Sequence, residues 1–323
     1  MISFGTVFLE LVFGQLDRLP GPGEEVFTDE FAISCGGAVT SASAAAAAGL
    51  RAGLCTRLGD DLGSQIVTEH CAATGVELAP SARVPGPAAG ITVVLNFDGD
   101  RGFVTHLPGP DRPEREVSRW QHVLGEHRPA WCYLHAGQPV PPFLRQAREQ
   151  GSKIMLDMSL GDERDSESVI ECVRLADVFV PNADELLALT GAATLDEAVR
   201  AAAAWGTPMV VTQGAAGALV WQPGGGATVV SDGISAVTAR DLTGAGDNFA
   251  GAMIGALAGG ASLVRAAEAG NAAGSRSVGR LGAVGEIGPA GAGAGWPWRP
   301  MLVSGVAAVL AAPGRTGSGE SER

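Results

Sequence analysis

Strands that alternate with helices are the dominant pattern in the second half of the chain. Short apolar runs predict strands at residues 130–135, 153–158, 178–180, 208–212 and 218–221. Longer segments between and after them predict helices at 141–150, 166–176, 184–189, 195–204 and 248–258. This alternation is typical of βαβ units, which place parallel strands in one sheet with helices against it. The pattern therefore predicts a layered α/β domain.

The first 108 residues mix this pattern with a different one. Apolar runs predict strands at 2–8 and 54–58, a closely packed alanine-rich helix at 40–50 and a further helix at 60–75. Residues 13–35 contain an alternating polar and apolar stretch, and residues 90–107 form two strand patterns around an Asp-Gly hairpin signal at 98–100. These two segments, 13–35 and 88–108, predict a small β lid on the main domain.

The length of 323 residues suits one large domain, which we expect to span residues 1–312. The Gly/Ala-rich stretch at 288–295 indicates a linker or loop. Residues 313–323 are polar and glycine-rich, and we expect a disordered tail there.

Composition narrows the classes of function. Hydrophobic residues make up 46% of the chain, which is enough for a large core, and the net charge of −13 argues against nucleic-acid or anionic-membrane partners. The five cysteines are scattered without a C-x-x-C pair, which indicates reduced thiols and no metal cluster. The sequence shows no signal peptide and no apolar stretch long enough to span a bilayer, so we expect a soluble cytoplasmic protein.

The single lysine, Lys153, excludes two classes of nucleotide enzyme. A P-loop NTPase and a protein kinase each need a lysine in a defined phosphate-binding motif, and Lys153 lies in neither. A dinucleotide-dependent oxidoreductase is also a poor fit, because no Gly-x-Gly-x-x-Gly follows the first strand.

The strongest chemical feature is the segment Asp-Leu-Thr-Gly-Ala-Gly-Asp at 241–247, which precedes an apolar helix. Glycines allow the backbone to approach a ligand closely, and the start of a helix offers N–H groups to an anion. On this interpretation Asp247 is a general base for a hydroxyl group. Charge on a transferring phosphoryl group would be stabilised by the amides of Gly244, Ala245, Gly246 and Asp247. Spacing alone leaves the alternative open that Asp247 is a plain helix cap.

This segment resembles the C-terminal motif of the ribokinase-like (PfkB) carbohydrate kinases, Asp-Thr-x-Gly-Ala-Gly-Asp, with Leu242 in place of the threonine. The resemblance covers about residues 1–285. It implies a three-layer α/β/α sandwich with a mostly parallel central sheet, ATP and Mg²⁺ as cofactors, and Asp247 as the catalytic base. It further implies a monovalent cation such as K⁺ near Asp241, Thr243 and the 282–283 loop.

On the substrate side, the family's Gly-Gly motif matches Gly36 and Gly37. Glu10 is the nearest match to a family aspartate that binds substrate hydroxyls, and Ser41 stands where the family usually has asparagine. His135 follows a strand and Phe103 lies in the lid, so we expect both to face the substrate.

On the nucleotide side, the resemblance assigns seven positions. Asn182 and Glu185 match the family's Asn-x-x-Glu motif, where Glu185 would act on Mg²⁺ through water, although the pair also fits a helix capping box. The turn with Thr212, Gly214 and Gly217 resembles the nucleotide-binding turn and also fits a plain hairpin, and Asn271 lies where the family often has an adenine-side asparagine. Asp157, at the end of a strand, is expected near the phosphates.

The sequence thus predicts an ATP-dependent kinase for a hydroxymethyl group of a small sugar. A nucleoside kinase of the same family is the runner-up, and a non-catalytic sugar-binding regulator stays open because Ser41 and Glu10 depart from the family. A small sheet is marginal alone, so we also expect the β lid to pair in a homodimer.

Overall fold

The computed structural model describes residues 1–97, 100–108, 113–135, 141–158, 166–230, 238–285 and 287. The expected linker at 288–295, the tail at 313–323 and the turn residues 98–99 lie outside the described residues.

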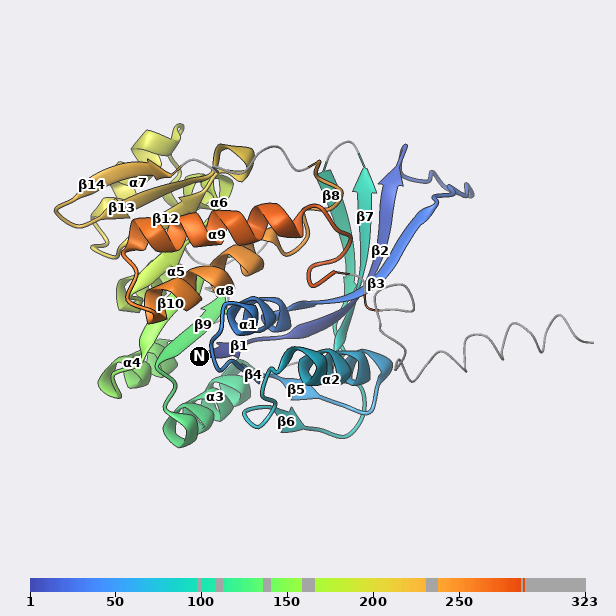
Figure 1. The fold of residues 1–323 in the computed structure, drawn as a ribbon, viewed down its shortest axis with the longest axis horizontal. Helices are drawn as coiled ribbons and strands as arrows, with labels where there is room; N and C mark the ends of the chain where they lie inside the picture. The colour runs from blue at the N-terminus through green and yellow to red at the C-terminus, as the bar shows by residue number, and fades with distance from the viewer. Residues whose placement is uncertain are drawn as a thin grey trace, which may run out of the picture.

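A mostly parallel sheet forms the centre of the molecule (Figure 1). Within the described residues it has eight strands in the order β14-β13-β12-β11-β10-β9-β1-β4. The last two strands along the chain, β13 and β14, are antiparallel to their neighbours. The strands are β1 (Ile2–Phe4), β4 (Gly53–Cys55), β9 (Trp131–His135), β10 (Lys153–Asp157), β11 (Val178–Val180), β12 (Met209–Thr212), β13 (Ala218–Gln222) and β14 (Gly226–Val230).

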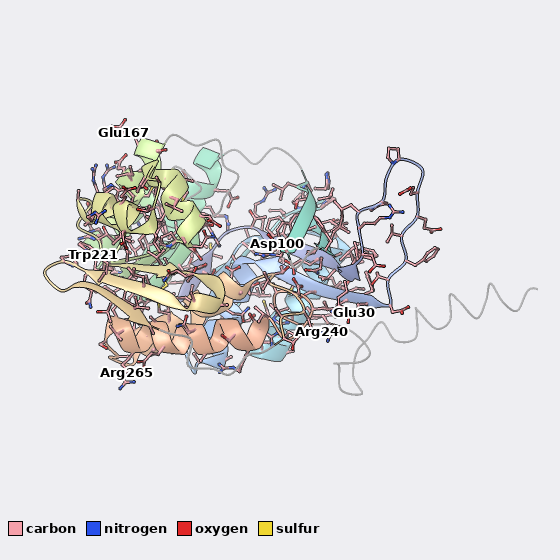
Figure 2. The ribbon with its side chains drawn as sticks, turned by 90° about the horizontal axis from the view of Figure 1, so that it is seen from above. Glu30, Asp100, Glu167, Trp221, Arg240 and Arg265 are labelled. Carbon is pink, nitrogen blue, oxygen red and sulfur yellow. The ribbon has the colours of Figure 1, made fainter. Side chains whose placement is uncertain are left out.

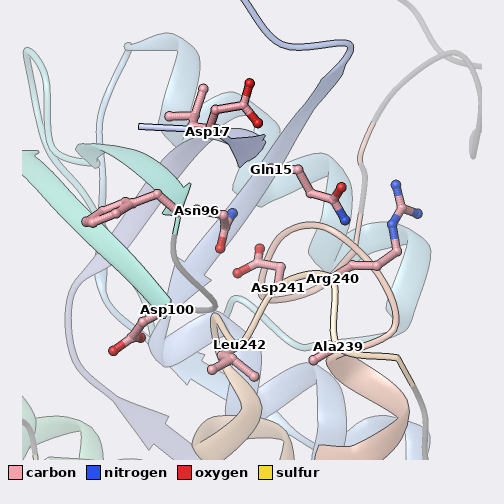
Figure 3. A pocket seen from close by; sticks show the side chains of 10 residues that line it. Gln15, Asp17, Asn96, Asp100, Ala239, Arg240, Asp241 and Leu242 are labelled. Carbon is pink, nitrogen blue, oxygen red and sulfur yellow. The ribbon is translucent and has the colours of Figure 1, made fainter. Parts of the chain in front are cut away.

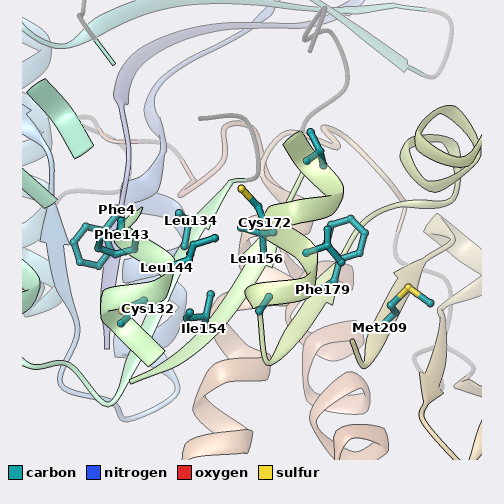
Figure 4. Close-up of a cluster of buried hydrophobic side chains, with 14 of the residues drawn as sticks. Phe4, Cys132, Leu134, Phe143, Leu144, Ile154, Leu156, Cys172, Phe179 and Met209 are labelled. Atoms are coloured by element: carbon teal, nitrogen blue, oxygen red, sulfur yellow. The ribbon is translucent and has the colours of Figure 1, made fainter. Parts of the chain in front are cut away.

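Helices cover both faces of this sheet and complete the three layers that the resemblance implied. One face packs against α3 (Pro113–His127), α4 (Pro141–Glu149), α5 (Ser166–Leu175), α6 (Ala183–Thr190) and α7 (Leu195–Ala203), and Figure 4 shows part of that core. The other face packs against α8 (Ala245–Ala258) and α9 (Leu263–Ser277). Among the described helices, none has both the length and the apolar composition that a bilayer crossing requires.

Side chains of each strand alternate between the two layers. On β9, Cys132 and Leu134 point into the first core, whereas Tyr133 points toward α8. On β10, Ile154 and Leu156 face the first core, whereas Met155 faces α8. This alternation decides which residues at the strand ends reach the start of α8.

The alanine-rich segment near residue 40 forms α1 (Ala38–Ala47), which packs closely against α8. A methyl group on Gly251 of α8 would lie 2.5 Å from the carbonyl oxygen of Ser41 and 2.6 Å from Ala44 Cβ. Small residues on both helices are therefore required for this approach. Next to α1 lie α2 (Leu62–Thr74) and the short strands β5 (Arg57–Leu58) and β6 (Ala82–Arg83).

The lid is a four-stranded sheet on one side of the domain (Figure 1). Its strands, in the order β3-β2-β7-β8, are β3 (Glu30–Gly37), β2 (Val7–Leu16), β7 (Gly90–Phe97) and β8 (Asp100–His106). The prediction of one strand at 2–8 was wrong. The chain leaves the central sheet after Phe4 and enters the lid at Val7, so the lid begins six residues before the expected position 13.

One ion pair links the lid to the loop before α8. Arg240 lies 3.1 Å from Glu30 of β3, and Figure 2 shows the two labelled side chains near each other. A cavity of about 300 Å³ lies next to this contact, between the ends of β2 and β7 and residues 239–242 (Figure 3). Its lining mixes polar residues such as Asp17, Asn96 and Asp241 with apolar ones such as Leu16 and Phe97.

Candidate active site

The start of α8 carries the predicted phosphate motif, three residues earlier than the helix was expected. Ala245, Gly246 and Asp247 are its first three helical residues, and Gly244 is its N-cap with a φ of 71°. Gly244 makes no side-chain cap, and the first helical bond runs from the Asn248 amide to the Gly244 carbonyl at 2.9 Å. The amide of Ala245 donates to Leu242 at 3.3 Å, so the helical geometry directs the amides of Gly246 and Asp247 out of the helix start.

Buried polar contacts hold this loop in place. Asp241 is 2% exposed, and its Oδ1 accepts hydrogen bonds from the amide and hydroxyl of Thr243 at 2.9 and 2.6 Å. Its Oδ2 accepts from the Gly282 amide at 2.7 Å. Asn248 Nδ2 donates to the carbonyls of Gly244 and Ala283. The loop is therefore fixed to the 282–283 turn. The monovalent cation near Asp241 and Thr243 stays a prediction.

Room for a ligand exists above the loop. A methyl group on Gly246 would meet no heavy atom within 4 Å, and the residue is exposed. A methyl group on Gly244 would lie 2.5 Å from Ala283 Cβ. The loop is thus packed on the Gly244 side and open on the Gly246 side, as an anion-binding helix start requires.

The carboxylate of Asp247 points to the central sheet and not to its own helix. Its Oδ1 lies 3.1 Å from the hydroxyl of Tyr133 and 3.4 Å from Nε2 of His135, and its side chain is 17% exposed. A plain cap would instead place the carboxylate on the first amides of α8. The contacts with β9 therefore favour a chemical role over the capping alternative.

His135 lies at the centre of the negative charges of the site. Burial alone would lower the pKa of His135, but the hydrogen bond to Asp247 and the surrounding carboxylates raise it to about 9. His135, Asp157 and Asp247 have potential ligand atoms within 4.8 Å of one another. We predicted that His135 faces the substrate, and the structure places it beside the predicted base.

Tyr133 is a site residue that the sequence reasoning missed. It is fully buried, and its hydroxyl oxygen lies within hydrogen-bond distance of Asp157 Oδ2, at 2.6 Å. Burial, with the charges of Asp157 and Asp247, raises the pKa of Tyr133 far above its ordinary value. The available signal was strand alternation, because residues 133 and 135 share one face of β9 and that face meets α8.

Glu10 occupies the buried floor between the lid and the 282–283 turn. It is 6% exposed, and its Oε2 accepts from the Ala283 amide at 3.2 Å. Burial raises the pKa of Glu10 to about 7, and the charges of Asp241 and Asp247 act in the same direction. A methyl group on Gly36 would overlap the Glu10 carboxylate, which explains why glycine is needed there. Gly37, with a φ of 76°, is the N-cap of α1.

Two of the predicted substrate residues, Ser41 and Phe103, lie in contrasting surroundings. Ser41 is fully buried, and its hydroxyl pairs with that of Ser3 at 2.9 Å, beneath the packing of α1. This placement does not support a contact of Ser41 with a substrate. Phe103 is 52% exposed on β8, where Arg101 lies over its ring at 5.6 Å.

The Asn-x-x-Glu segment forms the capping box that the sequence left as an alternative. Asn182 is the N-cap of α6, its Oδ1 accepts from the Glu185 amide, and Glu185 Oε2 accepts from the Asn182 amide, both at 2.8 Å. Glu185 is 6% exposed and adds to the negative charge around His135. Asn182 also pairs with Thr212 across neighbouring strand ends. The segment is therefore capped and close to the site.

The other predicted nucleotide residues lie at the antiparallel end of the sheet. Residues 214–216 form a short 3₁₀ turn that joins β12 and β13, so the segment is a hairpin, with Gly214 and Gly217 both at positive φ. A methyl group on Gly214 would meet no heavy atom within 4 Å. Asn271 on α9 is 7% exposed and donates to the Val230 carbonyl at 3.2 Å.

The raised pKa of Glu10 gives a testable pH dependence of stability. A carboxyl with a folded-state pKa above its ordinary 4.5 contributes stability below pH 4.5, and that contribution is lost as the pH rises through about 7. We therefore expect the free energy of unfolding of the wild type to fall by about 2–3 kcal/mol, relative to that of Glu10→Gln, as the pH rises from about 4 to about 8.5.

Urea unfolding of both proteins at these pH values measures the effect. Glu268→Gln is the matched control, because Glu268 lies on α9 in a salt bridge with Arg265 and is 42% exposed. If the free energies of unfolding of Glu10→Gln and the wild type differ by the same amount at every pH in this range, the pKa of Glu10 is not raised in the folded protein.

Comparison with known proteins shows the family of this chain. The model of the "pfkB family carbohydrate kinase" matches residues 2–287. An ATP-dependent ribose-1-phosphate kinase of Halopiger xanaduensis is 30% identical over 281 residues, covering 83% of this chain and 88% of that protein.

Two solved structures share the fold. The ribokinase of Arabidopsis thaliana, complexed with ribose and ATP, has a TM-score of 0.70 at 22% identity and covers 88% of this chain and 93% of its own. The adenosine kinase of Sinorhizobium meliloti has a TM-score of 0.72 at 21% identity, with 87% and 94% covered. The match of the family model over nearly the whole described chain, on the same motif that forms the start of α8, shows that the protein belongs to the pfkB family of carbohydrate kinases.

Proposed function

We propose that this protein transfers the γ-phosphate of ATP to a hydroxymethyl group of a small sugar or sugar derivative in the cytoplasm. The observation that supports it most directly is the position of Asp247, whose carboxylate stands at an open, glycine-lined helix start beside Tyr133 and His135. Five buried cysteines without disulfides are consistent with a reducing compartment.

In this proposal each part of the site has one task. Asp247 accepts the proton of the substrate hydroxyl as its oxygen attacks phosphorus. The amides of Gly246 and Asp247, together with that of Gly244, stabilise the charge on the transferred group, whereas the amide of Ala245 donates to the Leu242 carbonyl. Glu10, held by the Ala283 amide, accepts hydrogen bonds from substrate hydroxyls where it is ionised and donates one where it is protonated.

The residues present fit ATP and Mg²⁺. Open space beside Gly246 and Gly214 leaves two backbone surfaces for phosphates. We assign Asn271, which donates to the Val230 carbonyl, to the adenine side of the nucleotide. Glu185 supplies a buried carboxylate near the phosphates that would orient Mg²⁺-bound water. When bound, Mg²⁺ neutralises phosphate charge and orients the transferred group. K⁺ near Asp241 and Thr243 remains a further proposal.

Two observations bear on the substrate class, one from a relative and one from the lid. We favour a pentose or a related sugar, in keeping with the relative that acts on ribose-1-phosphate. The runner-up is a nucleoside, because Phe103 offers an exposed aromatic face on β8 for a base.

A coupled ADP-release assay over pentoses, ribose-1-phosphate, hexoses, sugar acids and nucleosides tests the proposal. We expect ADP formation that depends on one sugar class and on Mg²⁺. A non-catalytic sugar-binding regulator would instead show a thermal shift with sugar and no ADP above background, and that result would overturn the proposed activity.

We also propose that two lids pair in a homodimer. Strand β8 has exposed apolar side chains along it, with Phe103 at 52%, Val104 at 65% and the following Leu107 at 54% exposure. A four-stranded sheet with one such uncovered strand gains from a partner. Light scattering at micromolar concentration is expected to give twice the monomer mass, and Val104→Lys is expected to return the monomer. A monomer in the wild type at the same concentration would contradict the lid dimer.

A further inference from the structure

A single phenol bridges two carboxylates beneath the start of α8. The Tyr133 hydroxyl lies 2.6 Å from Asp157 Oδ2 and 3.1 Å from Asp247 Oδ1. Tyr133 is fully buried and Asp157 is 7% exposed, so water does not separate these oxygens at such distances. The chain of three oxygens runs from β10 through β9 to α8.

The number of protons that these three oxygens share is constrained. A phenol has one O–H and can donate it to one carboxylate at a time. If the hydroxyl donates to Asp247, the contact of 2.6 Å with Asp157 requires a proton on Asp157, which then donates to the phenol oxygen. Burial raises the pKa of Asp157, and the charge of Asp247 adds to this, although the charge of His135 acts against it.

The contacts also distinguish the two oxygens of Asp247. Among the described residues, Tyr133 and His135 both contact this carboxylate through Oδ1. Both come from the same face of β9, and that face is the one that packs against α8. Oδ2 takes part in neither of these two contacts, so it is the oxygen of Asp247 that is left for a ligand.

We propose that Tyr133 is a positioning residue that fixes Asp247 Oδ1 by a hydrogen bond, with a protonated Asp157 as its own donor, so that Oδ2 meets the substrate hydroxyl. This inference rests on the proposed role of Asp247 as the base. Asp247 Oδ2 takes the proton from the attacking hydroxyl, and the proton on Asp157 stays in place throughout. Tyr133 touches no reacting atom.

Charged groups on every neighbouring element act on these three oxygens of Asp157, Tyr133 and Asp247. They are His135 on β9, Asp157 on β10, Glu10 on β2 and, through His135, Glu185 on α6. Of these groups only Tyr133 and His135 contact the Asp247 carboxylate directly, so removal of the phenol hydroxyl frees Oδ1 on one side and loosens the orientation of the carboxylate.

Tyr133→Phe keeps the ring and removes only this hydroxyl. With the sugar that gives ADP release, we expect kcat to fall by about 10–100-fold, because the base loses its orientation. The KM values for sugar and ATP are expected to change by less than about twofold.

Thr207→Val is the matched control. The Thr207 hydroxyl is also buried and donates to the Val173 carbonyl at 2.7 Å, on the face of the sheet away from α8. We expect a comparable loss of stability in Thr207→Val with unchanged kcat and KM values. If Tyr133→Phe behaves like this control, or if its KM values rise as far as its kcat falls, the positioning role is overturned.

A second measurement does not depend on turnover. Tyr133 is the only tyrosine in the chain, so the NMR signal of its hydroxyl-bearing ring carbon reports on this residue alone. Asp247→Asn alters one of the two partners of the hydroxyl, and we expect this signal to shift, whereas Asp177→Asn leaves it in place. An unmoved signal in Asp247→Asn would overturn the inference. If no substrate gives ADP while the signal shifts, the proposed function fails and the contact between Tyr133 and Asp247 stands.

Discussion

Asp247→Asn is expected to lower kcat by about 10²–10⁴-fold, with the KM for ATP nearly unchanged. Asparagine has almost the same shape as aspartate and can keep a contact with Tyr133, but it cannot accept a proton from the substrate hydroxyl. The amides of the loop stay in place, because Asp241 and Asn248 hold them and not Asp247. Steady-state ADP release and ATP binding by calorimetry separate the loss of chemistry from any loss of binding.

Asp177→Asn is the matched control for this change. Its side chain is 22% exposed, close to the 17% of Asp247, and it accepts hydrogen bonds from Lys153 and from the Ile154 amide at 2.9 Å. This control loses a salt bridge at the opposite end of β10, so we expect a small loss of stability and normal turnover. Turnover of Asp247→Asn within a few-fold of the control would show that another group takes the proton.

Most of the central sheet could be predicted because its strands are short, apolar and separated by helices. Helix α9 and strand β14 were missed for identifiable reasons. Two glycines interrupt the helical pattern of α9, and Gly270 is there because the Phe249 ring lies where a methyl group would be, 2.8 Å away. Strand β14 is exposed at nearly every position and is stabilised by pairing with β13, which sequence periodicity does not record.

The start of the lid could not be predicted from periodicity, because residues 2–16 are apolar enough to be one strand. The chain changes sheets at residues 5–6, and the register with β3 and β7 decides where β2 begins. The motif at 241–247 was predictable, because the glycines and aspartates of a phosphate loop lie next to one another in the sequence. The contact of Asp247 with Tyr133 joins residues 114 positions apart, and only tertiary packing brings them together.

Gly244→Ala is expected to reduce kcat by roughly 10²-fold and to lower stability, because it disturbs the loop amides themselves. Gly244 has a φ of 71°, which costs an alanine about 1–2 kcal/mol. The new methyl group would also lie 2.5 Å from Ala283 Cβ and 3.3 Å from Thr40 Cγ2. The 282–283 turn cannot yield freely, since it also holds Glu10 and Asp241 through its amides. The loop must therefore shift, and the amides of Gly246 and Asp247 shift with it.

Gly260→Ala separates backbone strain from this steric effect. Gly260 follows the other end of α8, has a φ of 87° and has no heavy atom within 4 Å of an added methyl group. It is expected to lose about 1–2 kcal/mol of stability with normal kcat. Urea unfolding and ADP release on both variants measure the difference. Because the two glycines share the same backbone requirement, a selective loss of kcat in Gly244→Ala can come only from the packed side of the loop. Equal kcat in the two variants would mean that the position of these amides does not limit phosphoryl transfer.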